Sequence, residues 1–129
     1  TNSSYYPSNR PVAVSLSELA NNQISFLSYS IRNQEFAVCL IGNIVKDTVR
    51  VNNIELPQIH FASRTMISYN PCPSKDYLGV IHSHPDATPT SPQCNLSPID
   101  YNTFKEDQRA IVTGIICGNN YIRFYLKGK

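Results

Sequence analysis

The order of helix-like and strand-like segments predicts a mixed α/β domain, with one central mixed β-sheet flanked by helices. An amphipathic helical pattern spans about residues 15–31, and a β-rich run that ends at Gly42 follows it. A second helix is expected over residues 97–108, and two strands close the chain. The 129 residues can enclose one core, so we expect a single domain over residues 1–129, with residues 1–11 as an irregular lead-in.

A capping pattern and the spacing of apolar side chains predict the first helix. Ser15 and Glu18 fit the capping box, in which a serine caps the helix and an acidic side chain three residues later bonds back to it. The apolar residues that recur at helical spacing are Leu16, Leu19, Ala20, Ile24, Leu27 and Ile31. One face of this helix is therefore expected to pack against the sheet.

Runs of β-branched and aromatic residues predict the strands between the two helices. We expect strands over residues 35–41, over residues 48–56 with a break at Asn52 and Asn53, and around residues 61–69. A further run, residues 77–81, is apolar and β-branched and is expected to form a short buried strand.

The second helix has a clear start signal, and the chain closes with a hairpin. Ser97 stands at the N-cap position, a proline follows at the first helical position, and Asp100 lies in the first turn. Two strand-like runs, residues 110–117 and 121–126, are separated by Gly118-Asn119-Asn120, a sequence typical of hairpin turns. We therefore expect the last two strands to pair with each other.

The most informative residues are His82 and His84, which follow the buried run. Because side chains on a strand alternate between its two faces, both imidazoles are expected to leave on the same face. A carboxylate such as Asp100, brought back by the following loop, would complete three ligands for one divalent ion. Three protein ligands leave a tetrahedral zinc ion one position for water, which is the mark of a catalytic site rather than a structural one.

These residues stand in a pattern that resembles the JAMM (MPN-plus) zinc metalloprotease family. The family signature is a glutamate, then His-Ser/Thr-His-Pro, then Ser-x-x-Asp, and its elements in this chain are Glu35, His82-Ser83-His84-Pro85 and Ser97-Pro98-Ile99-Asp100. Glu35 also stands seven residues before Gly42, a spacing that is usual in the family. The resemblance covers most of residues 12–127 and implies an MPN/JAB-type domain with a cytidine-deaminase-like architecture.

One segment departs from the family pattern. The loop between His84 and Ser97 holds twelve residues, which is longer than the usual spacing. Because lengthening a loop costs little entropy, the ligand set can survive the insertion. The insertion lies at the rim of the expected active site, so it bears on specificity more than on chemistry.

The resemblance implies a role for each of these residues. His82, His84 and Asp100 would bind one Zn²⁺ ion, Glu35 would act as the general base, and Ser97 would donate a hydrogen bond to the oxyanion. The implied reaction is hydrolysis, by metal-activated water, of the amide or isopeptide bond after the C-terminal tail of ubiquitin or a ubiquitin-like protein. Two alternatives stay open: a processing protease for a small sulfur-carrier protein, and a non-catalytic MPN scaffold module.

The residues also admit simpler interpretations. Ser97 and Asp100 are fully explained as capping residues, and the two strand histidines need not bind a metal. Asp86 is a weaker candidate ligand than Asp100, and His60 is expected to be a surface or hydrogen-bonded histidine.

Composition and cysteine usage narrow the partners and the location. A net charge of +2 gives no reason to expect a nucleic-acid or membrane partner, and no apolar run approaches the roughly 18 residues of a membrane span. Cys39 and Cys117 lie in apolar runs and are expected to be buried thiols, whereas Cys72 and Cys94 could form a disulfide between two Pro-rich loops. Without a signal peptide or a CxxC pair, we expect a cytoplasmic protein with no structural zinc ribbon.

Overall fold

A mixed sheet of six strands lies at the centre of the computed structural model, which describes residues 11–118 and 121–128. In spatial order the strands are β1 (Ala13–Leu16), β3 (Thr48–Glu55), β2 (Ala37–Val45), β6 (Tyr77–His84), β7 (Val112–Cys117) and β8 (Tyr121–Leu126). Two neighbouring pairs are parallel, β1 with β3 and β6 with β7, and the other pairs are antiparallel. Strands β4 (Ile59–Ala62) and β5 (Ile67–Tyr69) form a separate antiparallel pair.

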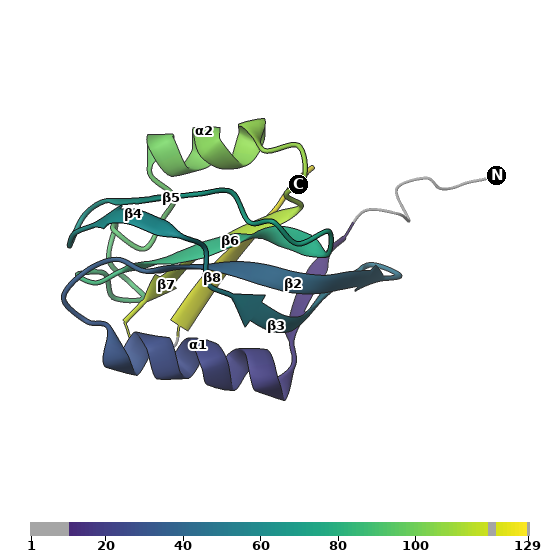
Figure 1. Ribbon diagram of the computed structural model, residues 1–129, viewed down its shortest axis with the longest axis horizontal. Coiled ribbons are helices and arrows are strands. Elements are labelled where there is room, and N and C mark those ends of the chain that lie inside the picture. The colour runs from purple at the N-terminus through teal and green to yellow at the C-terminus, as the bar shows by residue number, and fades with distance from the viewer. Residues whose placement is uncertain (1–10, 119–120, 129) are drawn as a thin grey trace.

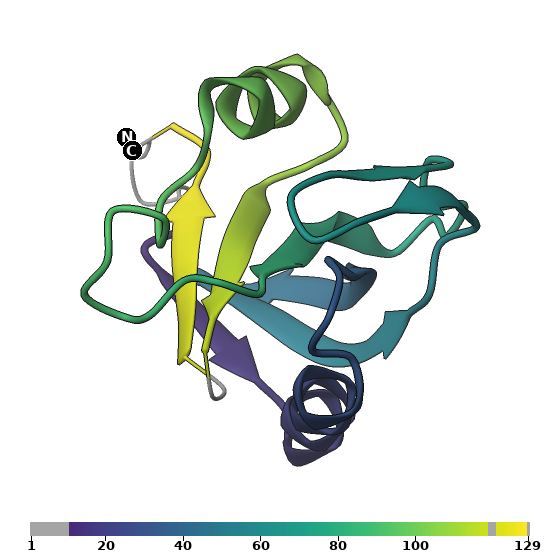
Figure 2. The same ribbon diagram turned by 90° about the vertical axis from the view of Figure 1, so that its left-hand side faces the viewer.

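The two helices of the described chain lie on opposite sides of this sheet (Figures 1 and 2). Helix α1 spans Glu18–Ser30, and helix α2 spans Pro98–Glu106. The prediction of a central mixed sheet flanked by helices is therefore confirmed. Neither of these described helices combines the length and the apolar character needed to cross a lipid bilayer.

The first helix begins later than predicted. Residues Ala13–Leu16 form strand β1, in which Leu16 is the register partner of Val51 on β3. The cap is Ser17, whose Oγ accepts a hydrogen bond from the backbone N–H of Ala20. The predicted start at Ser15 is wrong because the parallel ladder with β3 holds the backbone of these residues extended.

Strands β2, β3 and the β4–β5 pair also differ from the expected boundaries. Strand β2 continues through Gly42, where the register shifts and a Cβ would lie 1.8 Å from the carbonyl oxygen of Arg50. Strand β3 continues through Asn52 and Asn53 without the expected break: Asn53 is the register partner of Ile41, and the register shift leaves only Asn52 without a partner on β2. The single strand expected around residues 61–69 is instead a hairpin of two short strands.

The second half of the chain follows the prediction closely. Helix α2 starts after Ser97 with a proline at its first position, and β7 and β8 pair as a hairpin. The central residues of the hairpin turn, 119–120, and residues 1–10 of the expected lead-in lie outside the described part of the chain.

The main core lies between α1 and the sheet. Its fully buried members include Ala20, Ile24, Val38, Leu40, Val49, Ile81 and Val112. The opposite face of the sheet is packed less densely, because helix α2 has no buried residue. Space therefore remains on the face that α2 covers.

The cysteines pair differently from the expectation. Cys39 on β2 is bonded to Cys72, and Cys94 is bonded to Cys117 on β7. The expected free thiols at Cys39 and Cys117, and the expected Cys72–Cys94 bond, are wrong because each loop cysteine packs against the nearest strand cysteine. Disulfides are rare in the cytosol outside hyperthermophiles, so the cysteines give no support to a cytoplasmic location.

Replacement of Ile81 tests the main core, since Ile81 is fully buried on the central strand β6. We expect Ile81→Ala to lower the free energy of unfolding by about 2–5 kcal/mol, from lost burial and the cavity left behind. The control is Ile44→Ala on β2, which removes the same atoms from a side chain that is 43% exposed, and should cost less than about 1 kcal/mol. Urea denaturation measures both, and equal losses would contradict this assignment of the core.

Candidate metal centre

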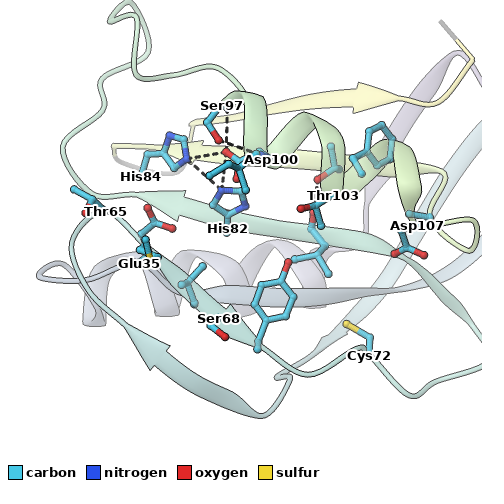
Figure 3. A pocket seen from close by; sticks show the side chains of 18 of the residues that line it. Glu35, Thr65, Ser68, Cys72, His82, His84, Ser97, Asp100, Thr103 and Asp107 are labelled. Carbon is cyan, nitrogen blue, oxygen red and sulfur yellow. Dashed lines mark hydrogen bonds and ion pairs between the residues drawn. The ribbon is translucent and has the colours of Figure 1, made fainter.

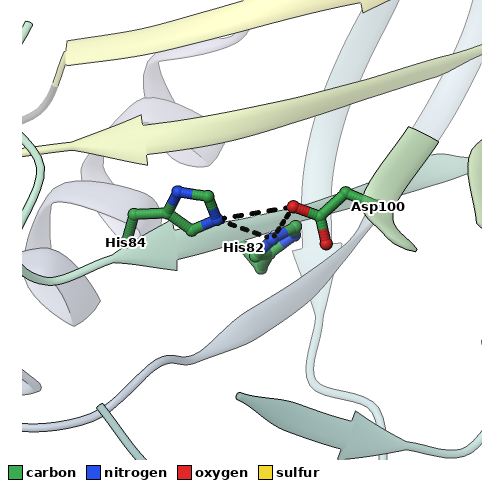
Figure 4. Close-up of side chains that lie close together, drawn as sticks. All are labelled: His82, His84 and Asp100. Atoms are coloured by element: carbon green, nitrogen blue, oxygen red, sulfur yellow. Dashed lines mark hydrogen bonds and ion pairs between the residues drawn. The ribbon is translucent and has the colours of Figure 1, made fainter. Parts of the chain in front are cut away.

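Two imidazoles meet at the end of strand β6. His82 and His84 leave the strand on the same face, as the alternation of side chains predicted, and they point toward α2 (Figure 4). Their Nε2 atoms are 3.2 Å apart. His82 is buried and His84 is half-buried, so the pair lies in a sheltered but accessible position.

Asp100 completes the cluster from the first turn of α2. Its Oδ2 lies 3.3 Å from Nε2 of His82 and 3.5 Å from Nε2 of His84. The same oxygen accepts a hydrogen bond from the backbone N–H of Ser97 at 3.1 Å, and the Oγ of Ser97 accepts one from the backbone N–H of Asp100 at 3.0 Å. The capping box at the start of α2 therefore also directs the carboxylate toward the imidazoles.

The donor atoms of this cluster suit a zinc ion. The possible ligand atoms of His82, His84 and Asp100 all lie within 4.8 Å of one another. Two imidazole nitrogens and one carboxylate oxygen form a ligand set that zinc takes in catalytic sites, where a fourth position stays open. The three residues therefore fit the metal that the sequence pattern implies.

Hydrogen bonds and charge set the protonation of two of these groups when no metal is bound. Burial by itself would raise the pKa of Asp100, but hydrogen bonds with His82, His84 and the N–H of Ser97 hold that pKa well below its usual range. Burial would lower the pKa of His84, but its bonds to Asp100 and to the carbonyl of Gln93 outweigh burial and raise it. An ionised carboxylate between two imidazoles favours the binding of a cation.

Glu35 lies beside the cluster although it is distant in sequence (Figure 3). It immediately precedes Phe36 and strand β2, and only 6% of its surface is exposed. Burial raises the pKa of Glu35, the nearby imidazoles oppose this, and the charge of Asp100 adds to it. A carboxyl group whose pKa is raised in this way accepts a proton more readily than an ordinary glutamate, as a general base requires.

Ser83 helps to fix the position of Glu35, a role that the sequence pattern did not predict. The Oγ of Ser83 accepts a hydrogen bond from the backbone N–H of Phe36 at 2.9 Å, and the Ser83 N–H donates to the Phe36 carbonyl at 2.9 Å. Ser83 is 6% exposed and leaves β6 on the face opposite the histidines. The sequence did hold one signal for this role: Ser83 stands between two histidines on a strand, and alternation places its hydroxyl on the opposite face of the sheet.

Two other polar residues lie outside the cluster. Asp86 forms a two-pronged ion pair with Arg64, with its Oδ1 2.6 Å from Nη2 and its Oδ2 3.2 Å from Nε. His60, on β4, forms a hydrogen bond with the side chain of Asn70. The structure therefore gives each of them a local partner and places neither beside His82.

A groove leads away from the candidate centre. It has a volume of about 830 Å³ and runs between β5 and α2 (Figure 3). Apolar side chains that line it include Met66, Ile67, Tyr69, Tyr77, Val80 and Phe104. Glu35, His82, His84, Ser97 and Asp100 all face the same groove, so a ligand held there would reach every group of the site.

Comparisons with known proteins bear on the fold. No profile of a known protein family and no curated protein sequence matches the chain. A solved structure, a Jab1/MPN domain protein from Archaeoglobus fulgidus, is similar with a TM-score of 0.53 and 19% sequence identity over 89% of each chain. The chain has the MPN/JAB fold. At this identity the similarity extends to the fold alone, and the predicted MPN/JAB-type architecture is confirmed.

The capping box on this MPN/JAB fold can be tested separately from any chemistry. We expect Ser97→Ala to lower the free energy of unfolding by about 1 kcal/mol, because the N–H of Asp100 loses its acceptor. Ser17→Ala removes the corresponding cap of α1 and should cost a similar amount. Only the change at Ser97 should also weaken zinc binding, as followed by competition with a chromophoric chelator. Equal zinc affinities for both variants would show that the cap does not help to orient Asp100.

Tyr69 makes the free energy of unfolding depend on pH in the alkaline range. Burial, together with the charges of Asp100, Asp107 and Glu35, raises the pKa of Tyr69 to about 12, whereas tyrosine in an unfolded chain titrates near 10. The folded state therefore holds this proton more tightly, and the stabilisation it gives below about pH 10 is lost as the pH rises toward about 12. Urea unfolding at a series of pH values should show a shallower decline for Tyr69→Phe than for the wild type. Parallel declines would contradict the assignment.

Proposed function

We propose that the protein is a zinc-dependent hydrolase of amide or isopeptide bonds, of the JAMM metallopeptidase type. The observation that carries this proposal is the convergence of His82, His84 and Asp100 with Glu35 beside them in one groove. A purely structural metal site would have no use for a buried carboxyl group next to the cluster. A general base for hydrolysis needs such a group within reach of the attacking water.

Each residue has a role that follows from its surroundings. Zinc held by His82, His84 and Asp100 would supply a water of lowered pKa, about 7, and would polarise the scissile carbonyl. Glu35 accepts the proton of the attacking water and later returns it to the leaving amine. The Oγ of Ser97 accepts the N–H of Asp100, so its own hydrogen remains to be donated to the oxyanion.

The shape of the groove supports an extended peptide as substrate. Among the described strands, β5 pairs with β4 alone, so its other edge has backbone groups for a further strand. A flexible C-terminal tail lying along this edge would bring the following bond toward the centre. We therefore propose ubiquitin or a ubiquitin-like protein, joined to a second group through its C-terminal tail, as the substrate class.

Two alternatives use the same fold. A protease that processes a small sulfur-carrier protein would share the chemistry and differ only in the carrier. A non-catalytic MPN scaffold would need neither the metal nor Glu35, and the presence of a full candidate ligand set favours the enzyme over it.

Net charge and cysteine chemistry bear on other partners and on the location. The net charge of +2 supports no nucleic-acid or membrane partner. A cytoplasmic location stays a prediction, and the redox state of Cys39–Cys72 and Cys94–Cys117 in cells would test it.

The decisive experiment combines zinc analysis with cleavage assays on di-ubiquitin and on a carrier-protein fusion. We expect about one zinc ion per wild-type chain, and Glu35→Gln should keep the zinc but lose about 10²–10⁴-fold in kcat, because it removes the general base. Glu18→Gln makes the same chemical change on the exposed first turn of α1 and should leave both properties unchanged.

The possible results separate the three functions. Wild-type protein without zinc, prepared in the absence of chelator, would rule out the enzyme and favour the scaffold. Zinc-loaded protein that cleaves neither substrate would overturn both proposed substrate classes. Cleavage of the fusion alone would favour carrier processing.

A further inference from the structure

The loop between β6 and α2, residues 85–97, packs against the sheet close to the candidate metal centre. Ala87 and Cys94 in this loop are buried against Ile115 and Cys117 of β7. The side chain of Asn95 accepts a hydrogen bond from Arg123 of β8 at 2.9 Å. Figure 2 shows the loop passing alongside β8 before it rises to α2. The loop is therefore anchored along its length to the two strands that follow it in sequence.

This loop makes a direct contact with one candidate ligand. The main-chain carbonyl of Gln93 lies 2.7 Å from Nδ1 of His84. Because a carbonyl oxygen can only accept, Nδ1 must carry the hydrogen of this bond. The other ring nitrogen, Nε2, faces Asp100 and His82 and is the atom left to bind a metal.

The disulfide fixes the carbonyl that makes this contact. Cys94 follows Gln93 directly, and its partner Cys117 is the register neighbour of His84 across the parallel β6–β7 pair. The disulfide therefore joins the residue that follows the Gln93 acceptor to the position on β7 that lies beside the His84 donor. The second disulfide joins Cys39 on β2 to Cys72 and does not involve this loop. Cys39 is the register partner of Val80, which lies two residues before His82.

We propose that the Gln93 carbonyl, held in place by the Cys94–Cys117 disulfide, is a positioning group that fixes the tautomer and orientation of His84 for metal binding. The inference rests on the proposed zinc site and adds that metal affinity depends on the Cys94–Cys117 bond but not on Cys39–Cys72. Carbonyl or carboxylate partners of metal-binding histidines typically contribute about 10–100-fold in affinity. The loop thus belongs to the metal centre although it supplies no ligand.

The first test needs no substitution. In the metal-free wild-type protein at about pH 9, above the ordinary imidazole pKa of about 6.5, ¹⁵N NMR reports which ring nitrogen of His84 carries the hydrogen. We expect the Nδ1–H tautomer. The Nε2–H tautomer would overturn the proposal, because the Gln93 bond would then be absent.

The second test compares the two disulfides in the full chain. Zinc affinity, measured by competition with a chromophoric chelator, should fall about 10–100-fold in C94A/C117A and stay unchanged in C39A/C72A. The control disulfide, Cys39–Cys72, spans 33 residues of sequence, whereas Cys94–Cys117 spans 23. Removing the control disulfide should therefore lower the free energy of unfolding at least as much. Urea denaturation of both variants checks this, and C94V/C117A, which restores volume, replaces C94A/C117A if the latter does not fold.

The outcomes distinguish this inference from the proposed function. Wild-type and C94A/C117A proteins with equal zinc affinity would overturn the inference alone, as would an equal fall in both double variants. A wild-type protein that binds no zinc would overturn the proposed function and the inference with it. A selective fall in C94A/C117A, together with the Nδ1–H tautomer, supports the positioning role.

Discussion

Strand β6 pairs antiparallel with β2 on one edge and parallel with β7 on the other, and these two ladders place most groups of the candidate centre. The β2 ladder sets Ala37 opposite His82, which brings the preceding Glu35 beside the imidazoles. The β7 ladder sets Cys117 next to His84, which anchors the loop that carries Gln93. A slip of one residue in either ladder would turn the side chains to the wrong face, so both registers are constrained by the site as well as by the core.

One face of the sheet carries the main core, and the other carries the candidate site. The α1 face holds the large apolar core, and the hydroxyl of Ser83 on that side ties Phe36 to the histidine strand. The α2 face keeps an open groove, because α2 buries no side chain fully. Polar contacts with β6 hold this helix instead, including the ion pairs of Asp100 with His82 and His84 and the hydrogen bond from Tyr77 to Asp107 beyond its end. Since Asp100 both caps α2 and faces the imidazoles, a metal ion held by this cluster would also hold the start of this helix against the sheet.

Much of the site was predictable because its signals are local. The alternation of a strand places His82 and His84 on one face, and a capping box joins Ser97 to Asp100 within four residues. The same kind of signal failed at Ser15, where the parallel ladder between β1 and β3 overrides a helix start that the residues alone favour. It also failed for the cysteines, because no spacing rule relates Cys39 to Cys72 or Cys94 to Cys117.

The sequence by itself determined the mixed α/β class, the face shared by the two histidines and the orientation of Asp100 at the start of its helix. Each of these follows from backbone geometry and from hydrogen bonds between neighbours in the chain. Only the tertiary structure decided that Glu35 is buried beside the cluster, that Gln93 contacts His84, and that a groove remains under α2. These features depend on strand register and side-chain packing between distant segments, which no local pattern encodes.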